Sequence, residues 1–186
     1  TAVGAVALVA VLAGAVLVPE LLDGEGGGRP SAPAPAVAPV PDRPPVGTTA
    51  APAVPAAVDR ALRSADPVAA VPALAWLRAR ALTERDERLL QMANVPGGPA
   101  AADDAALWAA LAEHRLRLDG LGFDVRSAEV VEHAGDRALL EVHVTTSAHR
   151  RVGPDGQVVG NVPAQERTTR LELVRHDGRW QVVASG

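Results

Sequence analysis

Hydrophobic and polar residues alternate one by one along residues 137–149. The positions on one side are Ala138, Leu140, Val142, Val144 and Thr146, and all of them except Thr146 are apolar. The positions between them are mostly polar or charged, namely Leu139, Glu141, His143, Thr145 and Ser147. A period of two predicts a β-strand with one face buried and the other in water, as in an antiparallel sheet that is covered on one side.

Four further segments repeat this alternation and are predicted to be strands: residues 123–132, 157–162, 165–176 and 179–184. Short turn sequences separate several of them, namely Gly135-Asp136, Pro154-Asp155-Gly156 and Asp177-Gly178. Glycine and aspartate tolerate the backbone conformations of tight turns, which predicts hairpins between antiparallel neighbours. We expect a curved sheet of four to five strands with these residues on its inner face: Leu140, Val142, Val144, Leu171 and Leu173.

Helical spacing precedes the strands. The pattern predicts a short helix over residues 56–65, then a longer helix with Asp66 as N-cap and Pro67 at its first position. Pro72 is expected to restart that helix, because proline interrupts helical hydrogen bonding. Residues 83–86 offer a further N-cap before a short apolar stripe, formed by Leu89, Leu90 and Met92.

A last helix is predicted from Asp103 or Asp104, either of which can cap it, to Gly120, which can end it. Five side chains lie along one side of this helix: Leu107, Trp108, Leu111, His114 and Leu118. Helices followed by a meander of strands predict an α+β domain over residues 56–186, with its N-terminal helices packed on the sheet.

Residues 1–18 are apolar and uncharged, which predicts a single transmembrane helix just long enough to span a bilayer. A cleaved signal segment is an alternative, since Ala13-Gly14-Ala15 fits a cleavage pattern of small residues, and a buried core helix is another. The chain begins with Thr1 rather than Met, so we expect a preceding segment whose basic residues would fix the orientation. Acidic residues after the apolar run favour an extracytoplasmic C-terminal domain at the cell membrane.

Residues 19–55 are rich in proline, alanine and glycine, which predicts a disordered linker. Each proline removes a backbone donor and disfavours helix in the residue before it. A polyproline-II-like tether of this length reaches up to roughly 100 Å. A proline-rich ligand for a recognition domain is the alternative, but the Ala-Pro repeats lack aromatic or basic anchors.

The sequence lacks cysteine, tyrosine and lysine, so all 18 basic residues are arginines. Without cysteine there is no disulfide, thiolate nucleophile or cysteine zinc site, and without lysine there is no Schiff base. A net charge of -4 argues against nucleic-acid binding. We expect no metal and no cofactor, because no short ligand spacing joins the five histidines: His114, His133, His143, His149 and His176.

Helices at residues 74–80, 83–92 and 105–118, followed by hairpin strands that end at Arg179-Trp180-Gln181-Val182, resemble the nuclear transport factor 2-like (cystatin-like α+β cone) superfamily. Within it, the chain is similar to membrane-anchored extracytoplasmic members of high-GC Gram-positive bacteria. The resemblance covers residues 57–185 and implies a cone of one curved sheet and three helices. That cone is an active site in ketosteroid isomerases, polyketide cyclases and dehydratases, and a binding or assembly module elsewhere. The family's tyrosine-bearing cavity is excluded here, since Phe123 is the only phenylalanine and tyrosine is absent.

His114 is the one candidate for a catalytic residue, because its spacing places it on the helix side that should face the sheet. Catalysis needs a carboxylate partner inside the cone, where the expected residues are apolar, so we interpret His114 as a hydrogen-bonded residue at the core edge. The candidates for ligand contact are Trp108, Leu111, His114, Leu140 and Val142. We interpret four outward residues as cross-strand charge pairs rather than a catalytic set: Glu141, His143, Arg170 and Glu172.

The sequence favours a non-enzymatic, membrane-tethered extracytoplasmic domain that binds or positions another cell-envelope component, as a monomer or weak homodimer. One alternative is an enzyme of the isomerase, cyclase or dehydratase type, which requires an acid or histidine inside the cone. Another is a carrier of an apolar small molecule, for which an apolar inner face suffices. The fold alone does not decide among them.

Overall fold

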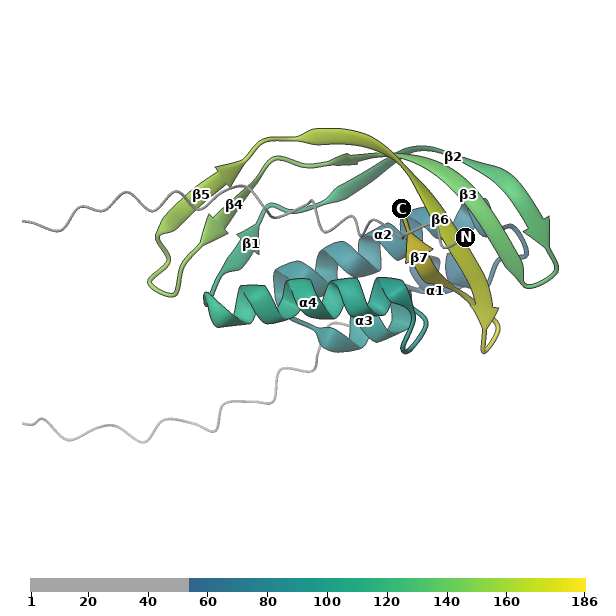
Figure 1. Ribbon diagram of the computed structural model, residues 1–186, viewed down its shortest axis with the longest axis horizontal. Coiled ribbons are helices and arrows are strands. Elements are labelled where there is room, and N and C mark those ends of the chain that lie inside the picture. The colour runs from purple at the N-terminus through teal and green to yellow at the C-terminus, as the bar shows by residue number, and fades with distance from the viewer. Residues whose placement is uncertain (1–53) are drawn as a thin grey trace, which may run out of the picture. The chain divides into compact units, whose positions relative to one another are not determined.

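The computed structural model describes residues 54–186. The expected transmembrane helix, at residues 1–18, and nearly all of the expected linker, at residues 19–55, lie outside these residues. Within the described part of the chain, no helix is both long enough and apolar enough to cross a membrane. All elements named below belong to one unit, Val54–Gly186 (Figure 1).

The elements follow the predicted order, with helices before strands. The helices are α1 (Ala56–Leu62), α2 (Pro67–Glu84), α3 (Glu87–Ala93) and α4 (Pro99–Glu113). The strands are β1 (Arg117–Asp119), β2 (Phe123–Ala134), β3 (Arg137–Thr146), β4 (His149–Val152), β5 (Val158–Val162), β6 (Gln165–His176) and β7 (Arg179–Ser185). The predicted α+β class is confirmed.

The three predicted hairpins are present, because β2 pairs with β3, β4 with β5 and β6 with β7, each antiparallel. The strands form two sheets rather than the single sheet expected, with the orders β2-β3-β6-β7 and β1-β4-β5. The strand predicted over residues 137–149 is split, because Ser147 leaves the ladder and hydrogen-bonds to Gly120 and Gly122. Together the strands arch over the helices, and all four helices lie on the concave side (Figure 1).

The predicted inner residues of the sheet are buried, completely for Leu140, Val142 and Leu173 and partly for Val144 and Leu171. They join inward residues of α2 and α3 and Trp180 of β7 in one hydrophobic cluster, called the main cluster below. The expectation of a wholly apolar inner face is wrong at Thr169, which lies opposite Val142 and is buried. Burial of this hydroxyl is tolerated because it donates a hydrogen bond to the Gly186 carbonyl oxygen.

The helix α2 runs through Pro72 without the predicted restart. Pro72 itself is exposed, while its neighbours Val71 and Ala73 are buried and keep this turn packed on the core. The helix continues to Glu84 and ends where Arg85 adopts a left-handed conformation, with φ 58°. Residues 83–86 therefore contain the end of α2 as well as the predicted cap of α3.

The predicted start of the last helix is wrong. α4 begins at Pro99, which occupies the first turn that proline favours, so Asp103 and Asp104 lie inside the helix and do not cap it. Its predicted end at Gly120 is also wrong, because the helix stops at Glu113 with His114 as its C-cap. Leu118, expected on the same helix, belongs to β1.

The helix α1 is attached to the end of the sheet through β7. Trp180 is 1% exposed, and its Nε1 donates to the carbonyl oxygen of Ser64 at 2.9 Å. Arg179 Nη2 donates to Asp59 of α1 at 2.7 Å. Hydrogen bonds from Arg63, and then from Arg179, hold the pKa of the Asp59 carboxyl below its usual value. These contacts fix the first described helix to the last strand.

Candidate functional site

Asp104 is a buried carboxylate on the concave side of the arch, where only apolar residues were expected. It is 3% exposed, and its Oδ1 accepts a hydrogen bond from Arg78 Nε at 2.8 Å. Its Oδ2 accepts another from Asn94 Nδ2, also at 2.8 Å. The Arg78 guanidinium lies 5.5 Å from the centre of the Phe123 ring, a cation–π distance. A buried carboxylate requires such partners. Arg78 of α2 and Asn94, which follows α3, supply them, so Asp104 joins α4 to both of these parts of the chain.

The hydrogen bonds to Asp104 limit its chemistry. A general base needs an oxygen within hydrogen-bond reach of the substrate's proton. Each Asp104 oxygen already accepts a hydrogen bond from a side chain of the domain, and the carboxylate is buried, so a substrate does not reach it in this arrangement. The arrangement favours a role in holding α4 to α2 and to the segment after α3.

The structure does not bring the predicted site residues together. His114 is exposed, because α4 ends one residue before it, and the expectation that it faces the sheet is wrong. No carboxylate within residues 54–186 hydrogen-bonds to its ring. The other candidates belong to two hydrophobic clusters: Leu140 and Val142 to the main cluster, Leu111 to a second cluster with Leu82 and Leu118, and Trp108 to the border of both.

The outward charged residues on β3 and β6 are cross-strand neighbours. Glu141 lies opposite Arg170, and Glu172 accepts a hydrogen bond from Arg137 at 2.8 Å. In residues 54–186, no group of three or more histidine, aspartate or glutamate side chains is placed to hold a metal ion.

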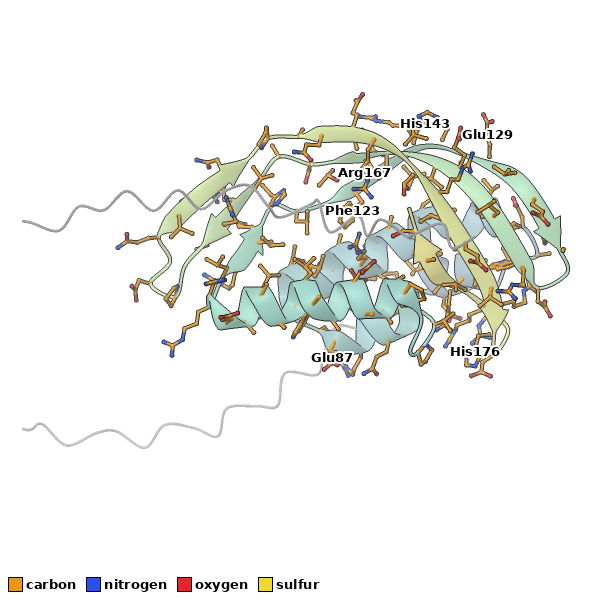
Figure 2. The ribbon with its side chains drawn as sticks, viewed as in Figure 1. Glu87, Phe123, Glu129, His143, Arg167 and His176 are labelled. Atoms are coloured by element: carbon orange, nitrogen blue, oxygen red, sulfur yellow. The ribbon has the colours of Figure 1, made fainter. Side chains whose placement is uncertain are left out.

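The convex side of the sheet contains a shallow hollow of about 520 Å³ over β2, β3 and β6. Thr168 Oγ1 lies 3.0 Å from His143 Nδ1, and Arg126 donates from Nε to Thr145 Oγ1 at 3.1 Å. Figure 2 shows His143 on the outer side of the arch, whereas Phe123 and Arg167 lie beneath it. The lining comes from Arg126 and Ser127 of β2, His143, Val144 and Thr145 of β3, and Glu166, Arg167 and Thr168 of β6.

The register of the strands builds this hollow. Ser127 pairs with His143, and His143 pairs with Thr168, so three polar side chains form one row across the sheet. A bulge after Val125 makes Arg126 the extra residue of β2, and bulges commonly redirect a side chain at functional sites. The lining offers hydroxyls, an imidazole, a guanidinium and a carboxylate, which suit a polar partner that both donates and accepts hydrogen bonds.

One signal in the sequence points to the burial of Asp104. Asp104 precedes Leu107, Trp108 and Leu111 by three, four and seven residues, which places it on the apolar side of the helix. The convex hollow has no comparable signal, because it depends on which residues of three separate strands become neighbours.

No protein-family model matches the sequence, and no curated protein matches it. Similar solved structures include the intermembrane-space region of the chloroplast protein ARC6, with 16% identity over 61% of this chain and 86% of that chain and a TM-score of 0.48. The β subunit of benzoate 1,2-dioxygenase from Burkholderia mallei has 10% identity over 66% of this chain and 89% of its own, with a TM-score of 0.46. An uncharacterised protein with a cystatin-like fold from Caulobacter vibrioides has 18% identity over 61% and 82%, with a TM-score of 0.39. No function of this chain follows from structural similarities of this size.

Proposed function

We propose that the chain is a non-enzymatic, membrane-tethered extracytoplasmic domain that binds or positions another component of the cell envelope. The observation that carries this proposal is the convex hollow, which presents exposed hydrogen-bonding groups from three strands. All four helices lie on the other side of the sheet, so no described element covers the hollow (Figure 1). A partner can therefore reach it without any rearrangement of residues 54–186.

The packing of the concave side supports the same proposal. Leu140, Val142 and Leu173 are in contact with the helices there, and the buried Asp104 is held by two neighbours. These side chains already have partners within the domain. On the convex side, by contrast, Ser127 and Glu166 are exposed and can exchange water for a partner.

The location rests on the sequence. Residues 1–18 are as apolar as a membrane span, and the proline-rich residues 19–55 provide a tether that lets the domain reach its partner. A tether of this kind fixes the domain to the membrane and leaves its orientation free.

Binding of residues 1–186 to envelopes isolated from the cells that make the protein tests this proposal. Thr168→Arg introduces a long charged side chain into the hollow and removes the hydroxyl next to His143, so we expect binding at least about tenfold weaker, or about 1.4 kcal/mol. Gln91→Arg makes the same charge change at an exposed position of α3 and should leave the affinity within about twofold. The proposal fails if saturable binding is absent, or if both variants bind as the parent chain does.

A further inference from the structure

The helix α4 is less buried than its length suggests. Only Ala100, Asp104 and Leu111 are buried among its 15 residues, and one of these three is charged. In α2, by contrast, eight of 18 residues are buried. The contacts of α4 with other elements are mainly with β7. Its attachment to the rest of the domain therefore depends on few apolar side chains.

The apolar residues beneath the end of α4 are separate from the main cluster. Leu111 of α4 packs with Leu82 of α2 and Leu118 of β1 in the second cluster, which holds three buried residues. The main cluster contains fifteen buried residues, and none of them belongs to α4. Loss of α4 from its place would thus expose the second cluster, and from the main cluster it would remove only Trp108, which is partly buried and packs against it.

Polar contacts at two points hold α4 in place. Asp104 is bound by Arg78 and Asn94, as described above. At the other end, Arg85 Nη2 donates to the carbonyl oxygens of Leu111 at 3.3 Å and of Leu116 at 2.7 Å. The Arg85 residue is exposed and the Arg78 side chain is 41% exposed, so water can replace both arginines when the contacts break.

We propose that α4 is a lid, which opens by local unfolding while the main cluster stays folded and so uncovers the second cluster. Segments with few buried apolar contacts open at lower free energy than the whole domain unfolds. Tight turns bound the helix on both sides, with Gly97 before it at a left-handed φ of 73° and Arg115 after it at a φ of 51°. The segment before Gly97 stays fixed, because Val95 N donates to the Val182 carbonyl oxygen at 2.9 Å.

Thiol labelling of residues 1–186 tests the lid directly, because this sequence contains no cysteine. Leu118→Cys places a thiol beneath α4, and Leu140→Cys places one in the main cluster. Under native conditions we expect a thiol reagent to react at position 118 more than about tenfold faster than at position 140. Equal rates that rise together with denaturant would show that only global unfolding exposes either position, and would overturn the proposal.

A second substitution identifies α4 as the moving part. Arg85→Asn keeps a residue that tolerates the left-handed backbone but is too short to reach Leu111 and Leu116. We expect it to speed labelling of the Leu118→Cys chain severalfold and to leave the Leu140→Cys chain unchanged. Arg88→Gln removes a neighbouring exposed arginine that pairs with Asp86, outside α4, and should change neither rate. An unchanged rate at position 118 in Arg85→Asn would contradict the lid.

Hydrogen exchange of the unsubstituted chain gives an independent reading if a cysteine variant does not fold. The amides of α4 should exchange at least about tenfold faster than the slowest amides of α2. Equal protection of the two helices, with the same response to denaturant, would overturn the proposal.

Discussion

Val142→Asp is expected to unfold the domain. Val142 is 2% exposed on β3 and packs within the main cluster, among apolar side chains. An unpaired buried carboxylate costs more than about 4 kcal/mol, against a total stability of about 5 to 15 kcal/mol for a domain of this kind. Denaturant unfolding followed by far-ultraviolet circular dichroism measures the change.

His143→Ala is the matched control at the adjacent position. His143 is exposed on the opposite face of β3, and its contact with Thr168 is open to water. The free energy of unfolding should change by less than about 1 kcal/mol, because water replaces the lost hydrogen bond. Similar destabilisation by the two substitutions would mean that the faces of β3 are assigned wrongly.

Asp104→Ala should lower the free energy of unfolding by about 2 to 4 kcal/mol. The substitution leaves the buried Asn94 amide without its acceptor, and it removes the partner of Arg78. Arg78 is partly exposed and can turn to water, which keeps the loss below that of a fully buried ion pair. Urea unfolding at neutral pH gives the value.

Asp103→Ala is the control for this prediction. Asp103 is exposed on the same helix, so its replacement should change stability by less than about 0.5 kcal/mol. If Asp103→Ala were the more damaging of the two, the sequence-based interpretation of a helix start at this aspartate would be correct and the start at Pro99 wrong.

Local patterns were sufficient to predict the strands and hairpins. The alternation along residues 165–176 gave both ends of β6, because each strand residue faces the side opposite to its neighbours. The hairpin turns were found because glycine and aspartate occur where the backbone needs them; Gly178, for example, has a φ of 72°. The break after β3 was not predicted, since it depends on hydrogen bonds between Ser147 and residues 25 or more positions away.

The helix boundaries were less predictable, because at each of them a local signal from a capping residue or a proline conflicts with another signal or with tertiary packing. Asp103 and Asp104 are good N-caps, but Pro99 fits the first turn of a helix equally well. The helix starts at Pro99, and the earlier start is favoured because Ala100 and Asp104 are then buried as helical residues. Pro72 was expected to interrupt α2, yet the buried residues beside it keep the helix continuous. The placement of His114 failed as a consequence, since it assumed that the helix continued five residues beyond Glu113, to Leu118.

The candidate site was mostly beyond reach of the sequence. Arg78 lies 26 residues before Asp104 in the sequence, and Asn94 lies 10 residues before it. The three side chains come together only through tertiary packing. The convex hollow likewise needs the register of three strands. Outward polar residues such as His143 were predicted correctly as exposed, but their grouping was not.

The central claim is that the convex face, and not the helix side, contacts the partner. Photo-crosslinking in intact cells tests it most directly, with a photoreactive amino acid at Glu129 on the convex side or at Glu87 on the helix side, both exposed (Figure 2). Both positions lie outside the hollow, so its lining stays intact. We expect a discrete crosslinked product from position 129 that disappears when the chain also carries Thr168→Arg, and no such product from position 87. A product from position 87 alone, or one from position 129 that persists with Thr168→Arg, would contradict the account.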